Sequence, residues 1–259
     1  MNLPKYATFG QRVGYYSFMT YCGLVFFFLI APIFVVLPLS FSASSFFEFT
    51  PEFMSLEPEA FSLKWYKQML GICGVDVTTV CTNKWMLGVR NSFIVGIAST
   101  LLATTLGTVA ALGLSRPHMP FKALIMALLI SPMIVPLIIT AAGMFFFYSQ
   151  IGLTHTFTGL ILAHTALGTP FVVITVTATL TGFDTNLIRA SQSLGANTLR
   201  TFFKVIMPLI LPGVISGALF AFITSFDEVV VVLFIGSIEQ VTIPKQMWAG
   251  LRQETSPVI

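Results

Sequence analysis

The chain alternates between long apolar segments and shorter polar ones, and this pattern predicts a bundle of membrane-spanning helices. A helix needs about 20 predominantly apolar residues to cross the hydrocarbon layer of a membrane. Segments of this length are expected at about residues 17–39, 91–114, 123–147, 156–180 and 209–237. The predicted fold class is therefore an all-α polytopic membrane protein. We expect the whole chain, residues 1–259, to form one transmembrane domain with a polar outer loop at about 40–88.

Prolines and threonines add detail to these segments. Ser131-Pro132 and Pro136 interrupt the third one, so a kinked or broken helix is expected there. Broken helices often line the substrate path of a transporter. In the second segment, Thr100, Thr104 and Thr108 share one face. Such a face favours close packing of helix on helix over a polar wall of the path.

Composition agrees with a membrane protein, because 56% of the residues are hydrophobic and only 9% are charged. A soluble domain carries about 25% charged residues. The net charge of +3 gives no indication of nucleic-acid binding, and no His/Cys cluster suggests a metal. Cys73 and Cys81 both fall in the outer loop, where a disulfide and two free thiols remain equal alternatives.

The distribution of charge predicts the topology, because cytoplasmic loops carry an excess of lysine and arginine. The N-terminus, the turn near residues 116–122 and the polar interruption at 184–208 would share one side of the membrane. On that side lie Lys5, Arg12, Arg116, Lys122, Arg189, Arg200 and Lys204, with Asp184 as the acidic residue. This side is therefore expected to be cytoplasmic, with the N-terminus inside.

The polar interruption at 184–208 is expected to form two short helices joined at a glycine. Asp184 is a candidate N-cap of the first helix, and Asn197 or Thr198 can cap the second. Gly195 can adopt the left-handed conformation that ends a helix. Pattern alone leaves open an ordinary amphipathic loop on the membrane surface.

The spacing of this interruption resembles a known signature. Arg189-Ala190-Ser191, then Gly195, then Pro208 resemble the "EAA" signature of the permeases of binding-protein-dependent ABC transporters. Arg189 stands where the signature has glutamate, which removes a carboxylate and leaves the helix–glycine–helix shape unchanged. The resemblance implies a cytoplasmic coupling helix that docks on an ATP-hydrolysing subunit. The coupling residues it implies are Arg189, Ala190, Ser191, Gly195, Ala196, Arg200, Lys204 and Pro208.

The last apolar segment carries Ser225-Phe226-Asp227-Glu228 in its interior. A charged side chain at membrane depth costs roughly 2.5–3.5 kcal/mol on insertion scales. Such carboxylates either make a structural pair or cap at a helix break, or they contact cargo, and the sequence leaves both open. His164 is expected to be a packing residue rather than a ligand. The candidates for the substrate path are Ser225, Phe226, Asp227, Glu228 and His164.

A narrower resemblance covers nearly the whole chain. FDEVVVVLFI, TIPKQMWAGLRQETSPVI and FSLKWY are similar to the polyamine (spermidine/putrescine) branch of these permeases, in particular the second permease subunit. This implies a bacterial inner-membrane heterodimer with a homologous permease, two ATPase subunits that bind ATP and Mg, and an external substrate-binding protein. Family members end with one more span, so a sixth is expected beyond residue 259.

This chain itself is expected to hydrolyse no ATP and to need no cofactor, because it has no phosphate-binding G-x-x-x-x-G-K-[ST] loop. The predicted function is the path for a small cationic solute. Alternatives are an ABC permease for another organic solute or iron, an ion-coupled transporter or channel using Asp227 and Glu228, and an intramembrane enzyme using His164.

Overall fold

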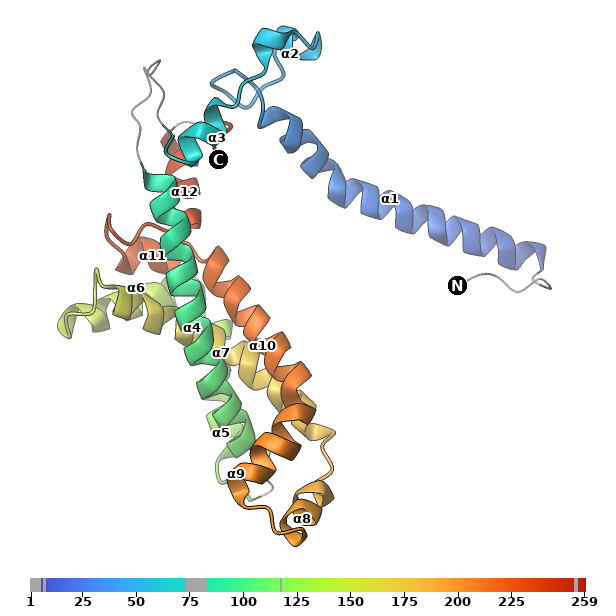
Figure 1. Cartoon of the computed structure of the whole chain (residues 1–259), viewed down its shortest axis with the longest axis vertical. Coiled ribbons are helices and arrows are strands. Elements are labelled where there is room, and N and C mark those ends of the chain that lie inside the picture. The colour runs from blue at the N-terminus through green and yellow to red at the C-terminus, as the bar shows by residue number, and fades with distance from the viewer. Residues whose placement is uncertain (1–5, 7, 73–82, 117, 254–255) are drawn as a thin grey trace. The chain divides into compact units, whose positions relative to one another are not determined.

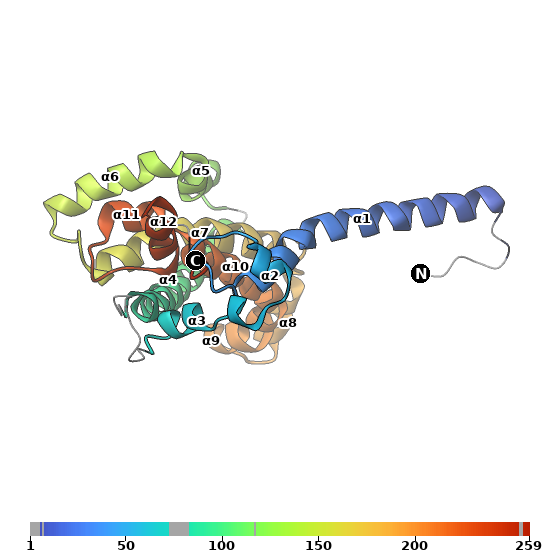
Figure 2. The same cartoon turned by 90° about the horizontal axis from the view of Figure 1, so that it is seen from above.

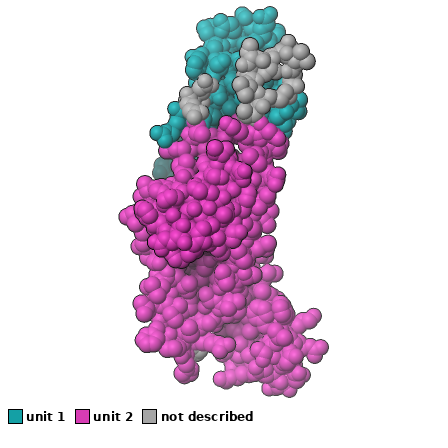
Figure 3. All heavy atoms as spheres, turned by 90° about the vertical axis from the view of Figure 1, so that its left-hand side faces the viewer, with its two compact units in different colours: residues 1–81, 250–259 teal, residues 82–249 magenta. Residues whose placement is uncertain are grey.

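The computed structural model describes residues 6, 8–72, 83–116, 118–253 and 256–259. The chain separates into two compact units, residues 1–81 with 250–259 and residues 82–249, which Figure 3 shows in two colours. The described residues are helical, apart from turns and one isolated antiparallel bridge between Ser42 and Phe61. This confirms the predicted all-α class. Cys73 and Cys81 lie outside the described residues.

The first unit begins with the long helix α1 (Phe9–Leu39), coloured blue in Figure 1. Thr8 caps it, because its hydroxyl accepts the backbone N–H of Gln11 while the Gln11 side chain accepts the N–H of Thr8. α1 thus begins eight residues before the predicted start of the span at residue 17, so it is longer than its most apolar part.

The predicted outer loop contains short helices in its first part, namely α2 (Pro51–Met54), the 3-10 helix η1 (Pro58–Ala60) and α3 (Lys64–Met69). Trp65 of α3 is buried, and its indole N–H donates to the backbone oxygen of Ser42 at 2.8 Å. This hydrogen bond holds α3 against the chain at Ser42.

The second unit is built on the long helices α4 (Lys84–Leu114), α7 (Phe157–Thr181) and α10 (Met207–Asp227), which pack along one another (Figures 1 and 2). α4 begins at Lys84, earlier than the expected residue 91. Small residues allow close packing: a Cβ atom on Gly107 would lie 2.7 Å from Val172. Thr108 is buried on the same helix. Thr100 and Thr104 are half-buried, but their hydroxyl oxygens are buried like that of Thr108, so this face packs against neighbouring helices, as predicted.

The third apolar segment is broken, as its prolines predicted. α5 (Lys122–Ile134) and α6 (Leu137–Gln150) meet at an angle of 103° across Val135 and Pro136. Pro136 has no N–H to continue the hydrogen bonds of α5, and residues before proline avoid the helical conformation. Each half is shorter than a span, so the pair forms either one broken span or a re-entrant loop.

The last predicted span ends earlier than expected. An apolar helix suited to spanning runs from Thr198 to Asp227. Residues 228–237, which the prediction placed in the same span, instead form a break and the short helix α11 (Val230–Ile235). α12 (Ile243–Gln253) follows. The length of the apolar run did not reveal this break, and a cap at a helix break was one of the alternatives that the sequence left open for the two carboxylates.

Candidate functional site

The predicted coupling loop has the expected helix–glycine–helix shape. α8 (Asn186–Ser193) and α9 (Thr198–Thr201) are joined through Gly195, whose φ is +84°. Asn197 caps α9, because its side-chain oxygen accepts the N–H of Arg200 at 2.8 Å. Asp184 lies one residue before the N-cap position of α8, where its carboxylate accepts the N–H of Asn186.

The loop presents apolar and basic side chains together. Leu194, Leu199 and Phe203 are 88%, 69% and 61% exposed. Inside the loop, the hydroxyls of Ser191 and Thr201 lie 3.0 Å apart and join α8 to α9. Of the predicted coupling residues, Arg189, Ala190, Gly195, Arg200, Lys204 and Pro208 are exposed, whereas Ser191 and Ala196 are half-buried. Exposed apolar side chains gathered in this way mark an interaction surface, for another protein or for lipid.

A turn of π-helix, Phe202–Ile206, connects α9 to α10. Its hydrogen bond runs from the N–H of Met207 to the oxygen of Phe202, five residues back. Pro208 follows directly, and its ring cannot coexist with a regular α-helical bond to Lys204 because proline has no N–H and clashes with the carbonyl four residues earlier. The proline of the signature therefore explains the wide turn.

His164 and Ser225, both candidates for the substrate path, are buried between helices. The Nδ1 atom of His164 lies 2.7 Å from the Oγ atom of Ser225, and the hydroxyl of Ser99 donates to the same Oγ at 3.0 Å. His164 is 1% exposed, and its Nε2 has no partner among the described residues. The three side chains connect α7, α10 and α4, in line with the expected packing role of His164.

The two carboxylates at the end of α10 have different surroundings. Glu228 is 7% exposed and accepts the N–H of Val231 at 2.9 Å, at the start of α11. Asp227 is exposed, and its carboxylate makes no hydrogen bond or ion pair with the residues that the structure describes. Glu228 thus acts as a cap at the helix break, while Asp227 is available to an external cation.

Phe226 belongs to a cluster of aromatic rings between α4 and α10. Its ring centroid lies 5.4 Å from that of Phe93 and 5.4 Å from that of Phe222. Phe93 is 46% exposed, so the cluster reaches the surface. The structure therefore places Phe226 in a packing contact whose outer edge is open.

A second set of contacts, about two turns into α4, was not predicted. The amide of Asn91 donates to the backbone oxygens of Glu239 and Val241 at 2.8 and 2.9 Å, and the hydroxyl of Ser92 accepts the N–H of Ile243. These bonds fix the loop between α11 and α12. An asparagine at the beginning of an apolar run was the available signal, but it did not identify the partner.

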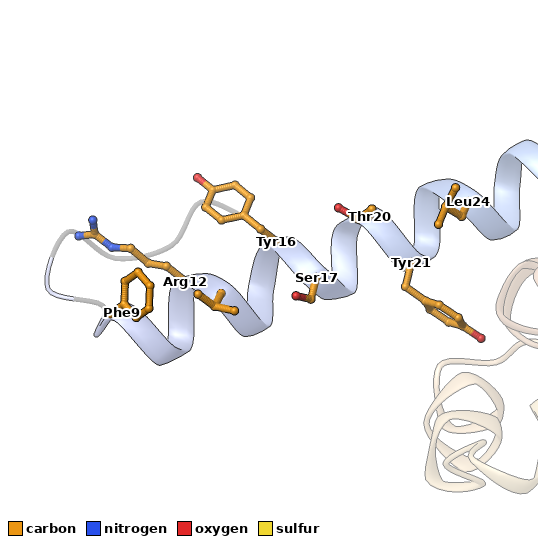
Figure 4. A pocket seen from close by; sticks show the side chains of 8 residues that line it. Phe9, Arg12, Tyr16, Ser17, Thr20, Tyr21 and Leu24 are labelled. Carbon is orange, nitrogen blue, oxygen red and sulfur yellow. The ribbon is translucent and has the colours of Figure 1, made fainter.

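An open hollow of about 740 Å³ lies along one side of α1 and is lined by that helix (Figure 4). Phe9, Tyr16, Thr20 and Leu24 project from successive turns. No second element forms an opposite wall in the described structure, so this hollow is not a ligand site. Among the described residues, no group of three or more His, Cys, Asp or Glu side chains could hold a metal ion.

Comparison with known proteins places these features in a family. Residues 103–258 match the model of the "Binding-protein-dependent transport system inner membrane component" family. The chain is 26% identical to the spermidine/putrescine transport system permease protein PotC of Haemophilus influenzae over 91% of this chain and 85% of that protein. It is also 26% identical to the PotC protein of Escherichia coli, over 94% and 84% of the two chains.

Two further comparisons reach relatives with other cargo in their names. The chain is 30% identical to the sulfoquinovosyl glycerol transport system permease protein SmoH of Agrobacterium fabrum, over 57% of this chain and 52% of that protein. A crystal structure of a bacterial ABC transporter involved in the import of the acidic polysaccharide alginate contains a chain that matches with a TM-score of 0.72 at 15% identity, covering 98% of this chain and 91% of that chain. The chain therefore belongs to the family of inner membrane components of binding-protein-dependent transport systems, the permeases of ABC importers.

Proposed function

We propose that this permease forms the path for a small cationic organic solute, a polyamine such as spermidine or putrescine. The observation that carries the proposal is Asp227, an exposed carboxylate at the end of α10 with no partner in the described structure. An ammonium group that leaves water needs a counter-charge. The names of the two PotC relatives agree with this cargo.

The surroundings of Asp227 also suit an organic cation. Phe226, the preceding residue, contributes to the partly exposed aromatic cluster with Phe93 and Phe222. Aromatic faces attract ammonium groups by about 0.5–2 kcal/mol, depending on how far the cation is desolvated. A carboxylate beside aromatic rings therefore favours a cationic amine with an apolar carbon chain.

Transport requires partners beyond this chain. We infer a heterodimer with a second homologous permease, an external binding protein that delivers cargo, and two ATPase subunits that bind and hydrolyse ATP with Mg. The exposed side chains Leu194, Leu199 and Phe203 would enter a cleft of an ATPase subunit. The charge distribution supports a cytoplasmic N-terminus and coupling loop, and this chain would bind no cofactor of its own.

In the mechanism we propose, closure of the two ATPases moves α8 and α9, and the rigid connection through Thr198–Asp227 carries that motion to the other end of the bundle. The path would then open alternately to the outside and the inside. In Figure 1, α8 and α9 lie at the opposite end of the bundle from α11, so motion at the loop must travel the length of α10.

The other candidates fit the structure less well. An acidic cargo, such as that named for the alginate importer, would be repelled by Asp227. An ion-coupled transporter or channel leaves the exposed apolar surface of α8 and α9 unexplained. An intramembrane enzyme would require His164 to act with a carboxylate, whereas its hydrogen-bond partner is Ser225. Another organic cation, or iron, remains the alternative that the experiment below addresses.

The test is ATP-dependent uptake of radiolabelled spermidine and putrescine into proteoliposomes that hold the whole complex with its binding protein. We expect saturable uptake that is blocked by unlabelled polyamines. In the absence of ATP, an imposed sodium or proton gradient should not drive uptake. Uptake driven by the gradient alone would contradict ATP-driven import. Stimulation of ATPase activity by the binding protein without polyamine uptake would retain the permease role and reject the cargo.

A further inference from the structure

The short helix α11 (Val230–Ile235) is held in place by charged groups at its two ends. A helix of six residues is unstable by itself, because it forms too few internal hydrogen bonds to offset the cost of nucleation. At its start, the Glu228 carboxylate accepts the N–H of Val231. A negative charge at the start of a helix and a positive charge at its end both interact favourably with the helix dipole.

The positive charge at the other end is Lys245, from the first turn of α12. Its Nζ atom donates to the backbone oxygens of Ser237, Gly236 and Val232, at 2.9, 3.2 and 3.5 Å. The oxygen of Val232 also accepts the N–H of Gly236, at 3.0 Å, whereas Gly236 and Ser237 follow the end of α11. An ammonium has three N–H donors. Lys245 therefore bonds to the backbone at and just beyond the end of α11.

Lys245 is half-buried, and burial lowers the pKa of its ammonium. A lysine on a solvated surface would extend its flexible side chain so that the ammonium stays in water. Here the ammonium instead turns toward backbone oxygens. The contacts of Lys245 thus distinguish it from a lysine that serves only as a surface charge.

α11 connects this lysine to the end of the proposed path. Val231, Val232 and Ile235 are completely buried and pack against side chains that include Leu160 and Ala163 of α7. Figures 1 and 2 both show α11 beside α6, and the two helices are in contact. The opposite end of α11 is separated from α10 by Glu228 and Val229, directly after Asp227.

We propose that Lys245 is a positioning residue for the cargo path: its ammonium fills a site of three carbonyl oxygens, fixes the end of α11, and so holds Glu228 and the chain break beside Asp227. The expected effect on transport rests on the proposed function. Its structural part concerns the order of α11 and can be measured without cargo.

The experiment compares Lys245→Ala with Lys245→Met and with Lys84→Ala in the whole complex. Lys84 is an exposed lysine at the start of α4 and serves as the matched control. Hydrogen–deuterium exchange over residues 229–236 and polyamine uptake are measured with and without methylammonium. Methylammonium is small enough to supply an ammonium at the vacated carbonyls, and tetramethylammonium, which has no N–H donor, is the control cation.

We expect Lys245→Ala to expose the amides of α11 to exchange and to raise the KM for polyamine about tenfold, as for the loss of a hydrogen bond to a charged group. Methylammonium should restore protection and much of the uptake in Lys245→Ala, relative to wild type. It should do less in Lys245→Met, whose side chain occupies the space. Tetramethylammonium and the Lys84→Ala variant should show no such effect.

Two results would overturn the proposal. Unchanged exchange over residues 229–236 in Lys245→Ala would show that the lysine does not order α11. A lower KM in that variant would show that Lys245 acts by repelling cationic cargo. If the wild-type complex takes up no polyamine, the proposed cargo fails, while the exchange measurement still tests the role of Lys245.

Discussion

The Nδ1 atom of His164 in α7 lies 2.7 Å from the Oγ atom of Ser225 in α10, and Ser99 of α4 bonds to the same oxygen. This contact lies within two residues of Asp227, the exposed carboxylate at the end of α10. His164 is thus part of the support of the proposed path rather than its wall. We expect the orientation of the last turn of α10 to depend on this contact.

Replacement of His164 tests this support. His164→Asn keeps a polar nitrogen or oxygen near the position of Nδ1, whereas His164→Ala leaves Ser225 without that partner. We expect His164→Ala to destabilise the protein by about 1–3 kcal/mol more than His164→Asn, because the buried Ser225 hydroxyl then keeps the bond from Ser99 but loses the one to His164. Thermal unfolding in detergent measures the difference. Equal loss in the two variants would assign the effect to packing volume alone.

The carboxylates of Asp227 and Glu228 should respond differently to substitution. We expect Asp227→Asn to raise the KM for spermidine about tenfold while assembly with the ATPase is unchanged, since Asp227 has no partner in the described structure. Glu228→Ala removes the cap of α11 and should instead lower thermal stability, by about 1 kcal/mol. Uptake kinetics and co-purification separate the two effects. Equal loss of assembly in Asp227→Asn would make Asp227 structural.

Gly195 should tolerate substitutions according to backbone conformation rather than size. Its φ is +84°, and a Cβ atom there would meet nothing within 4 Å. Gly195→Val should therefore distort the loop at a cost of about 1–2 kcal/mol, whereas asparagine adopts this conformation more readily. We expect Gly195→Val to reduce ATPase co-purification and uptake, and Gly195→Asn to retain most of both. Similar behaviour of the two variants would show that the left-handed turn is not required for docking.

The π turn before Pro208 offers a test of coupling. Pro208→Ala restores an N–H and permits a regular α-helix. Conversion of the wide π turn to α-helical hydrogen bonds would rotate α9 by about 100° relative to α10. We expect fewer solute molecules transported per ATP hydrolysed. Pro212→Ala, one turn further into α10, is the matched control and should preserve the ratio. An unchanged ratio in Pro208→Ala would remove the π turn from the coupling mechanism.

Close packing of α7 on α10 gives a final prediction. A Cβ atom on Gly168 would lie 3.0 Å from the Cβ atom of Ala221. Gly168→Ala should destabilise the protein by about 1–3 kcal/mol through overpacking. Adding Ala221→Gly removes the opposing methyl group and should recover part of that loss. Thermal unfolding of the single and double variants measures the recovery, and purely additive losses would contradict this contact.

The sequence by itself determined the features that depend on local chemistry. Apolar length identified the spans, because every backbone group in lipid must bond within its own helix. Pro136 predicted the break between α5 and α6, since proline has no N–H to donate. Gly195 predicted the turn between α8 and α9, since glycine adopts positive φ without steric cost.

The tertiary structure alone decided which distant residues meet. His164 and Ser225 are 61 positions apart, and Asn91 bonds to backbone oxygens about 150 positions later. It also distinguished Asp227 from Glu228, between which the sequence made no distinction, and it placed the ammonium of Lys245 against the backbone oxygens at the end of α11. The physical reason is that the apolar pattern marks which segments enter the membrane, whereas the packing of small residues sets which helix faces approach one another.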